Sequence, residues 1–154
     1  MTLYEVSSLY EKLASQATRK SDIKLFARYE KIMNNLQQRA FTSEQLQQIE
    51  DKLTAMKLQE GGSKASFHRK KLSEFTNFLK KEFSLVTTGY HTNLGLVLGM
   101  TLGTGMGLGL GTAFGPKGIS LGLPIGTGFG MAIGVAFGTM KDAQAKKEGL
   151  VIDV

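Results

Sequence analysis

Over the first ninety positions, apolar residues recur at helical spacing among polar ones, and the chain then becomes almost uniformly apolar. Apolar residues that recur every three to four positions are typical of helices with one buried face. Thr42 followed by Gln45 has the spacing of a capping box, and Ser21 with Asp22 offers an N-cap. The pattern predicts a small antiparallel bundle of four helices, at about residues 3–13, 23–40, 43–56 and 64–86.

Glycine falls at every fourth position in two successive runs of the apolar part. The runs comprise Gly95, Gly99, Gly103, Gly107, Gly111 and Gly115, and then Gly118, Gly122, Gly126, Gly130, Gly134 and Gly138. On a helix this spacing gives one nearly continuous face without side chains, along which two backbones approach closely. From Thr92 to Met140 the only charged residue is Lys117. This combination favours helices that associate inside a membrane, where small residues drive packing.

The apolar part contains two segments of 22 residues each, 93–114 and 119–140. As a helix, each segment would be about 33 Å long, which matches the thickness of the hydrocarbon layer of a bilayer. The turn of the predicted hairpin comprises Gly115, Pro116, Lys117 and Gly118. An interior glycine costs a helix in water about 1 kcal/mol, but an unpaired backbone amide in hydrocarbon costs several kcal/mol. The membrane therefore favours the helices. We predict an all-α chain with a polar helical module at 1–88, a transmembrane hairpin at 89–140 and a charged tail at 141–154.

Two further glycines of the first apolar segment, Gly105 and Gly109, lie on the opposite helix face from Gly103 and Gly107. A helix that is smooth on two sides accepts its hairpin partner on one and a neighbouring subunit on the other. The alternation of glycine in this stretch also fits a strand with one bare face, although the period of four dominates. The residues expected to pack helices or subunits are Gly95, Gly99, Gly103, Gly105, Gly107, Gly109, Gly111, Gly122, Gly126, Gly130, Gly134 and Gly138.

Basic residues gather at the base of the predicted hairpin rather than at its tip. Lys80 and Lys81 precede the hairpin and Lys141, Lys146 and Lys147 follow it, whereas one lysine marks the tip. The preference of basic residues for the cytoplasmic side predicts that both termini lie in the cytoplasm and that the membrane is the cytoplasmic one. Basic residues of the fourth helix are either a solvated face or contacts to anionic lipid head groups. The candidate contacts are Arg69, Lys70, Lys71, Lys80 and Lys81 of this helix, together with Lys141 after the hairpin.

Several kinds of chemistry lack the residues they need. The chain has no cysteine, and its two histidines, His68 and His91, are too far apart in sequence to form a metal-ligand motif. The glycines have neither the dinucleotide-binding spacing nor a following Gly-Lys-Ser/Thr. Acidic residues interleave with the basic ones, which argues against nucleic acid as a partner. We therefore predict no enzyme, no metal and no cofactor.

The Gly-x-x-x-Gly series, as in Gly95-x-x-x-Gly99-x-x-x-Gly103 and Gly126-x-x-x-Gly130-x-x-x-Gly134, resembles that of the glycine-zipper membrane proteins of bacteria. The similarity is to small two-span members with a polar helical N-terminal part and a Lys-rich tail, and it covers about residues 90–148. It implies homo-oligomers in a membrane, and some glycine-zipper proteins are channels. Residues 1–90 carry no such resemblance.

Three functions fit this organisation. The leading hypothesis is a homo-oligomer whose hairpins form a ring-like pore or channel, with the N-terminal modules as a cytoplasmic collar. The second is a non-conducting membrane scaffold in which residues 1–86 bind a protein partner. The third is an effector that is made in soluble form and later inserts into a membrane. Packing and pore lining both use small residues, so the sequence does not separate the first two.

Overall fold

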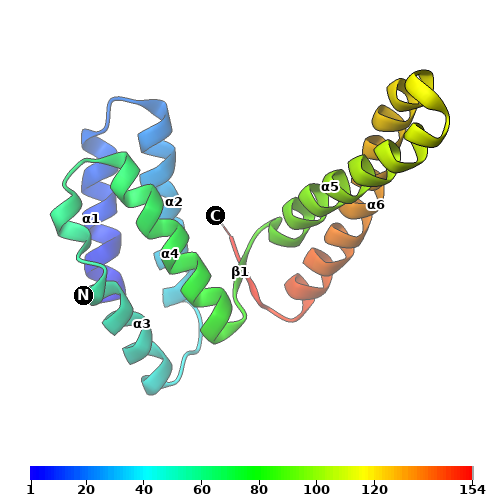
Figure 1. The fold of residues 1–154 in the computed structure, drawn as a ribbon. Helices are drawn as coiled ribbons and strands as arrows, with labels where there is room; N and C mark the ends of the chain where they lie inside the picture. The colour runs from blue at the N-terminus through cyan, green and yellow to red at the C-terminus, as the bar shows by residue number, and fades with distance from the viewer. Residues whose placement is uncertain (154) are drawn as a thin grey trace. The chain divides into compact units, whose positions relative to one another are not determined.

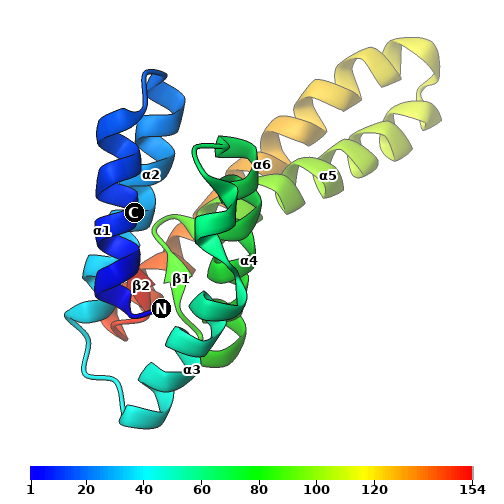
Figure 2. The ribbon, with the colours of Figure 1, turned by 90° about the vertical axis from the view of Figure 1, so that its left-hand side faces the viewer.

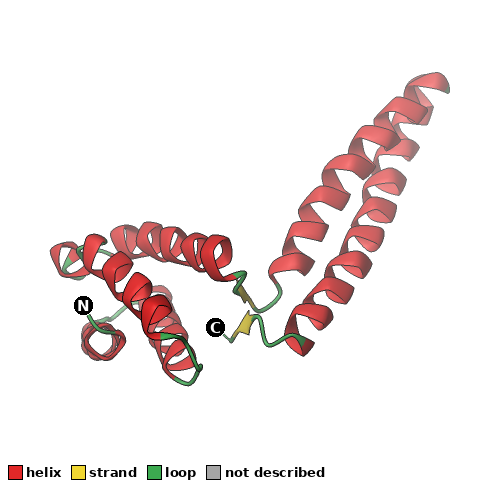
Figure 3. Ribbon diagram, turned by 90° about the horizontal axis from the view of Figure 1, so that it is seen from below, coloured by secondary structure: helices red, strands yellow, loops and turns green. Residues whose placement is uncertain are grey.

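The computed structural model describes residues 1–153, except for the side chain of Pro116, and the chain divides into two units (Figure 1). Of the described residues, the N-terminal unit contains Met1–Thr87 together with Ile152 and Asp153. The second unit contains Thr88–Val151. Helices make up nearly all of both units (Figure 3), and the two long apolar ones lie in the second unit. The predicted all-α class is therefore confirmed.

The described part of the N-terminal unit has four α-helices. They are α1 (Leu3–Gln16), α2 (Lys20–Gln37), α3 (Ser43–Ala55) and α4 (Ala65–Phe83), with the short 3-10 helix η1 (Leu58–Gly61) before α4. The predicted capping box of Thr42 and Gln45 opens α3 and is confirmed. The predicted N-cap at Ser21 and Asp22 is wrong, because α2 already begins at Lys20 without a side-chain cap. The Ser21 hydroxyl instead donates to the Asp22 carboxylate over 3.0 Å.

The core of the N-terminal unit is centred on His68 of α4, which is fully buried. Its Nδ1 lies 2.8 Å from the hydroxyl of Tyr10, and its Nε2 lies 2.8 Å from the carbonyl oxygen of Gly62. The rings of Tyr10 and Tyr29 stack at 3.9 Å, and the Tyr29 hydroxyl donates to the His68 carbonyl over 2.8 Å. Because a carbonyl only accepts, Nε2 carries the proton and Nδ1 accepts from Tyr10. Burial lowers the pKa of His68, so the ring is held neutral.

A two-stranded sheet joins segments that are far apart in the chain, β1 (Val86–Thr87) and β2 (Val151–Ile152) (Figure 2). Val86 and Ile152 are both buried. The fourth helix, which we predicted to reach residue 86, ends at Phe83 because Ser84 adopts a left-handed conformation with φ of 55°. The expected charged tail differs too, since the last long helix runs to Lys147 and β2 follows it.

The second unit is an antiparallel pair of helices, α5 (Tyr90–Ala113) and α6 (Gly115–Lys147), joined by Phe114 (Figure 1). The predicted turn extends too far, because only Gly115 lies at the reversal of the chain after Phe114, whereas Pro116, Lys117 and Gly118 already belong to the first turn of α6. Gly115 has φ of 75°, a conformation that glycine adopts without strain just after a helix. Proline fits the first turn of the next helix, where its missing amide has no partner to lose.

Candidate functional site

Glycine forms the facing surfaces of α5 and α6. The inner glycines, as we call them, are Gly95, Gly99, Gly103, Gly107 and Gly111 of α5 and Gly118, Gly122, Gly126, Gly130, Gly134 and Gly138 of α6. A Cβ atom added to Gly103 would lie 2.9 Å from the Cα of Gly130, and one added to Gly126 would lie 2.6 Å from the Cα of Gly107. Real side-chain carbons essentially never come so close to another backbone. Even alanine at these positions would therefore force the helices apart.

Apart from Gly115 at the connection, three other glycines of the two helices take no part in this contact, Gly105 and Gly109 of α5 and Gly128 of α6. A Cβ atom at any of the three would meet nothing within 4 Å, and all three residues are exposed. We call them the outer glycines. The structure thus divides the predicted packing residues into a set that joins the two helices and a set, Gly105 and Gly109, that leaves a smooth surface on α5.

The large apolar side chains of the hairpin point outward. Leu110 and Phe129, for example, are each 70% exposed. Both helices are long and apolar enough to cross a membrane, with 24 residues in Tyr90–Ala113 and 31 in Lys117–Lys147. Burying a Leu or Phe side chain is worth about 1.5–3 kcal/mol, so a hairpin that folds in water would turn these residues inward. Here the smallest residues lie inside and the largest outside.

An apolar groove of about 620 Å³ follows one side of the hairpin. Leu102 and Met106 of α5 and Phe129 and Ile133 of α6 contribute to its walls, and inner glycines line it as well. None of the residues that line it is charged. The groove therefore fits hydrocarbon rather than a polar ligand.

Every Ser and Thr hydroxyl between Thr92 and Thr139 is hydrogen bonded inside the hairpin. Most donate to a carbonyl three or four residues earlier in the same helix, as Thr112 does over 2.8 Å. The hydroxyls of Thr104 and Thr127 meet across the two helices at 2.8 Å. Thr127 gives its only proton to the carbonyl of Leu123, so Thr104 is the donor of this pair. None of these groups needs water as a partner.

Asp142 of α6 closes the open end of the hairpin. Its carboxylate accepts from the backbone amides of His91 and Thr92, both at 2.9 Å, and from the Thr92 hydroxyl at 2.6 Å. The His91 Nδ1 lies 3.0 Å from the same carboxylate. The first amides of a helix have no partner within it, so a side chain of α6 caps α5. No pattern in the sequence marks Asp142, because only the register of the hairpin brings it to this position.

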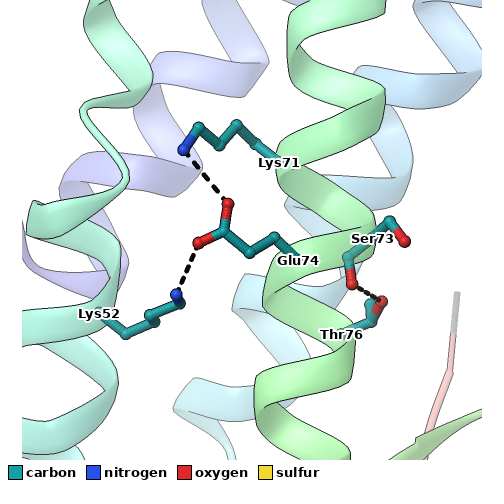
Figure 4. Close-up of polar contacts among 5 residues, drawn as sticks. All are labelled: Lys52, Lys71, Ser73, Glu74 and Thr76. Atoms are coloured by element: carbon teal, nitrogen blue, oxygen red, sulfur yellow. Dashed lines mark hydrogen bonds and ion pairs between the residues drawn. The ribbon is translucent and has the colours of Figure 1, made fainter.

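The predicted lipid head-group contacts fall into two groups. Lys71 lies 3.2 Å from Glu74, and Lys52 of α3 lies 2.6 Å from the same carboxylate (Figure 4). Hydrogen bonds from the two lysines lower the pKa of Glu74. Lys81 pairs with an adjacent glutamate at 4.0 Å. The exposed basic residues outside these pairs are Arg69, Lys70, Lys80 and Lys141, and in the described chain Arg69, Lys70 and Lys141 make no ion pair.

No protein-family model matches the chain, and no curated protein or solved structure matches it either. Within residues 1–153, no three His, Asp or Glu side chains are grouped so that they could hold a metal ion. The resemblance to glycine-zipper proteins and the absence of enzymatic activity both stay predictions.

Proposed function

We propose that this protein is a membrane-anchored scaffold whose α5–α6 hairpin is embedded in a bilayer and self-associates through α5. The observation that carries the proposal is the inverted packing of the hairpin, with glycine between the helices and Leu, Ile, Phe and Met side chains outside. Lipid chains solvate such side chains, and close backbone contact then holds the helices together. The apolar groove along the hairpin suits acyl chains in the same way.

A scaffold accounts for the hydroxyl groups better than a pore does. A water-filled lumen needs polar groups that face it. The hydroxyls of Thr101 and Thr112 bond to carbonyls of their own helix, and Thr104 bonds to Thr127. With these groups satisfied, the hairpin serves as an anchor. Its two ends lie together, so the segments that precede and follow it emerge on one side of the bilayer, where the N-terminal unit is the part that binds a partner.

The second candidate is a pore, and the outer glycines favour it. Gly105 and Gly109 leave a smooth surface on the side of α5 that does not face α6. A subunit that contacts a neighbour on each of two sides can form a lateral series of subunits. The series closes into a ring if the rotation from one subunit to the next brings the last one back to the first. The pore and the scaffold share self-association and differ in conduction.

The first test asks whether the hairpin is embedded. We expect the full chain to stay in the membrane pellet after an alkaline carbonate wash, because hydrocarbon contacts do not depend on charge. Release into the supernatant would contradict the anchor and the pore together. A flux assay on proteoliposomes then separates the two, since ion passage would replace the scaffold by the pore.

The second test concerns self-association. Replacing both outer glycines of α5, in Gly105→Leu/Gly109→Leu, should reduce the mass of the detergent-solubilised particle to that of one chain, as measured by light scattering. Leu102→Met, on an exposed apolar position, is the matched control and should keep the native mass. An unchanged mass in the double variant would show that this face of α5 is not the interface.

A further inference from the structure

A groove of about 440 Å³ lies between α2 and α4 of the N-terminal unit, and we call it the polar groove because most of the residues that line it are polar. Figure 2 labels both helices. Each helix lines it with residues spaced as one helical face, from Ser21 to Arg28 on α2 and from Arg69 to Thr76 on α4. Leu25 and Leu72, both buried, give the groove an apolar base. The groove thus belongs to the packing of two helices and not to a mobile loop.

Three cationic side chains line this groove, Lys24 and Arg28 from α2 and Arg69 from α4. No acidic residue is among the residues that line it, and in the described chain these three make no ion pair. The other side of α4 shows the contrast, because there Glu74 forms ion pairs with both Lys52 and Lys71 (Figure 4). Uncompensated positive charge in a concave site attracts an anion.

The groove also offers hydroxyl groups. Thr76 is engaged already, because its hydroxyl contacts the carbonyls of Leu72 at 3.0 Å and of Ser73 at 3.2 Å (Figure 4). The Ser73 and Thr87 side chains line the groove and have no hydrogen-bond partner among the described residues. A guanidinium group presents several N–H donors in a planar fork that matches phosphate, and hydroxyls add further donors.

We propose that this groove binds the phosphate group of an organic phosphate, with Arg28 and Arg69 as the principal ligands and Lys24 as an added charge. The two arginines come from different helices, so a phosphate between them would also link α2 to α4. The apolar base formed by Leu25 and Leu72 suits a ligand that carries carbon next to its phosphate. Either a lipid head group or a soluble phosphate ester has this chemistry. The proposal does not depend on the scaffold function, because it concerns the N-terminal unit alone.

The experiment uses the full chain in a neutral detergent and two probes that share one head group, glycerol 3-phosphate and short-chain phosphatidylglycerol. Native mass spectrometry and calorimetric titration measure binding of each. The test variant is Arg28→Gln/Arg69→Gln, and the control Lys12→Gln/Lys31→Gln removes the same charge from exposed positions outside the groove. Circular dichroism checks that each variant keeps its helices.

We expect at least one probe to bind and the test variant to weaken binding about tenfold or more, because each arginine supplies hydrogen bonds between charged groups. The control should bind like the native chain. Binding of glycerol 3-phosphate identifies a soluble ester as sufficient, whereas binding of the lipid alone identifies a head group.

Two results would overturn the proposal, namely no binding of either probe, or equal weakening by the test variant and the control. The second would mean that net charge, and not the groove, attracts the anion. Arg28→Lys/Arg69→Lys keeps the charge and loses the planar fork, so intermediate affinity would support phosphate as the bound group. Neither result depends on whether the chain resists a carbonate wash, so this proposal and the scaffold proposal fail separately.

Discussion

At the scale of single residues, His68 is the most constrained polar side chain of the N-terminal unit. One ring nitrogen accepts from Tyr10, the other donates to the Gly62 carbonyl, and the backbone carbonyl of His68 accepts from Tyr29. The ring also packs edge-on against Tyr10, with centroids 5.3 Å apart. A second proton on the ring would remove the acceptor that Tyr10 uses and would place a charge in the core.

This arrangement predicts that mild acid destabilises the N-terminal unit. The pKa of His68 is lowered from 6.5 in the folded chain, so the unfolded chain takes up the proton at higher pH. Its stabilising contribution is complete above about pH 6.5 and is lost as the pH falls toward the folded-state pKa. In that interval we expect the free energy of unfolding to drop by up to about 1.4 kcal/mol per pH unit. Denaturant unfolding of the full chain, followed by circular dichroism at a series of pH values, measures it.

The variant His68→Gln serves as the control, because it cannot titrate. It should be less stable at neutral pH and should lose the pH dependence in this interval. Glu74 does not obscure the result, since its pKa is lowered from 4.5 and its contribution disappears only at lower pH. The same slope in His68→Gln would place the titrating group elsewhere.

At the scale of elements, the hairpin keeps one register along its whole length. Gly95 faces Gly134, and every fourth residue along α5 faces every fourth residue back along α6, as far as Gly111 and Gly118. A single residue, Phe114, separates the two helices. Asp142 reaches the first amides of α5 only because the register is kept to the end.

The inner and outer glycines should respond oppositely to the same substitution. Gly103→Ala puts a methyl group against the backbone of α6, and overpacking of this kind costs about 1–3 kcal/mol. In Gly105→Ala the added methyl group has no neighbouring atom, and alanine has a higher helix propensity than glycine. The variant hairpin should therefore be at least as stable as the native one. Unfolding in mixed detergent and dodecyl sulfate micelles, followed by circular dichroism, compares the two. Equal destabilisation would contradict the close approach at Gly103.

The glycine period predicts which residues of α5 and α6 lie between the helices, because a spacing of four is a property of one helix alone. It makes the turn too long, since glycine followed by proline is equally typical of a loop and of the end of one helix and the start of the next. The polar groove has no sequence signal. Lys24 and Arg28 lie far from Arg69 in the chain, and only the packing of α2 on α4 makes them neighbours.

At the scale of the whole molecule, the hairpin is an insertion in the N-terminal unit. The chain leaves that unit after β1, forms α5 and α6, and returns in β2, where Ile152 is 1% exposed. The residues that complete the unit are thus separated from the rest of it by the full length of the hairpin.

We therefore predict that Ile152→Ala destabilises the N-terminal unit, although residue 152 follows the apolar helices. Replacing a buried Ile by Ala costs about 2–5 kcal/mol, and the lower end applies at the edge of a core. Hydrogen exchange of the α4 amides measures the effect. Tyr4→Ala, at a position that is 73% exposed, is the control and should change little. Unchanged exchange in Ile152→Ala would show that β2 contributes nothing to the unit.

The return of the chain in β2 also sets an order of events during synthesis. Ile152 leaves the ribosome only after the whole of α5 and α6, so the N-terminal unit stays incomplete while the hairpin is being made. Translation thus delivers both apolar helices to the cell before the unit that precedes them closes. Any factor that receives the hairpin during translation meets a partly open helical bundle.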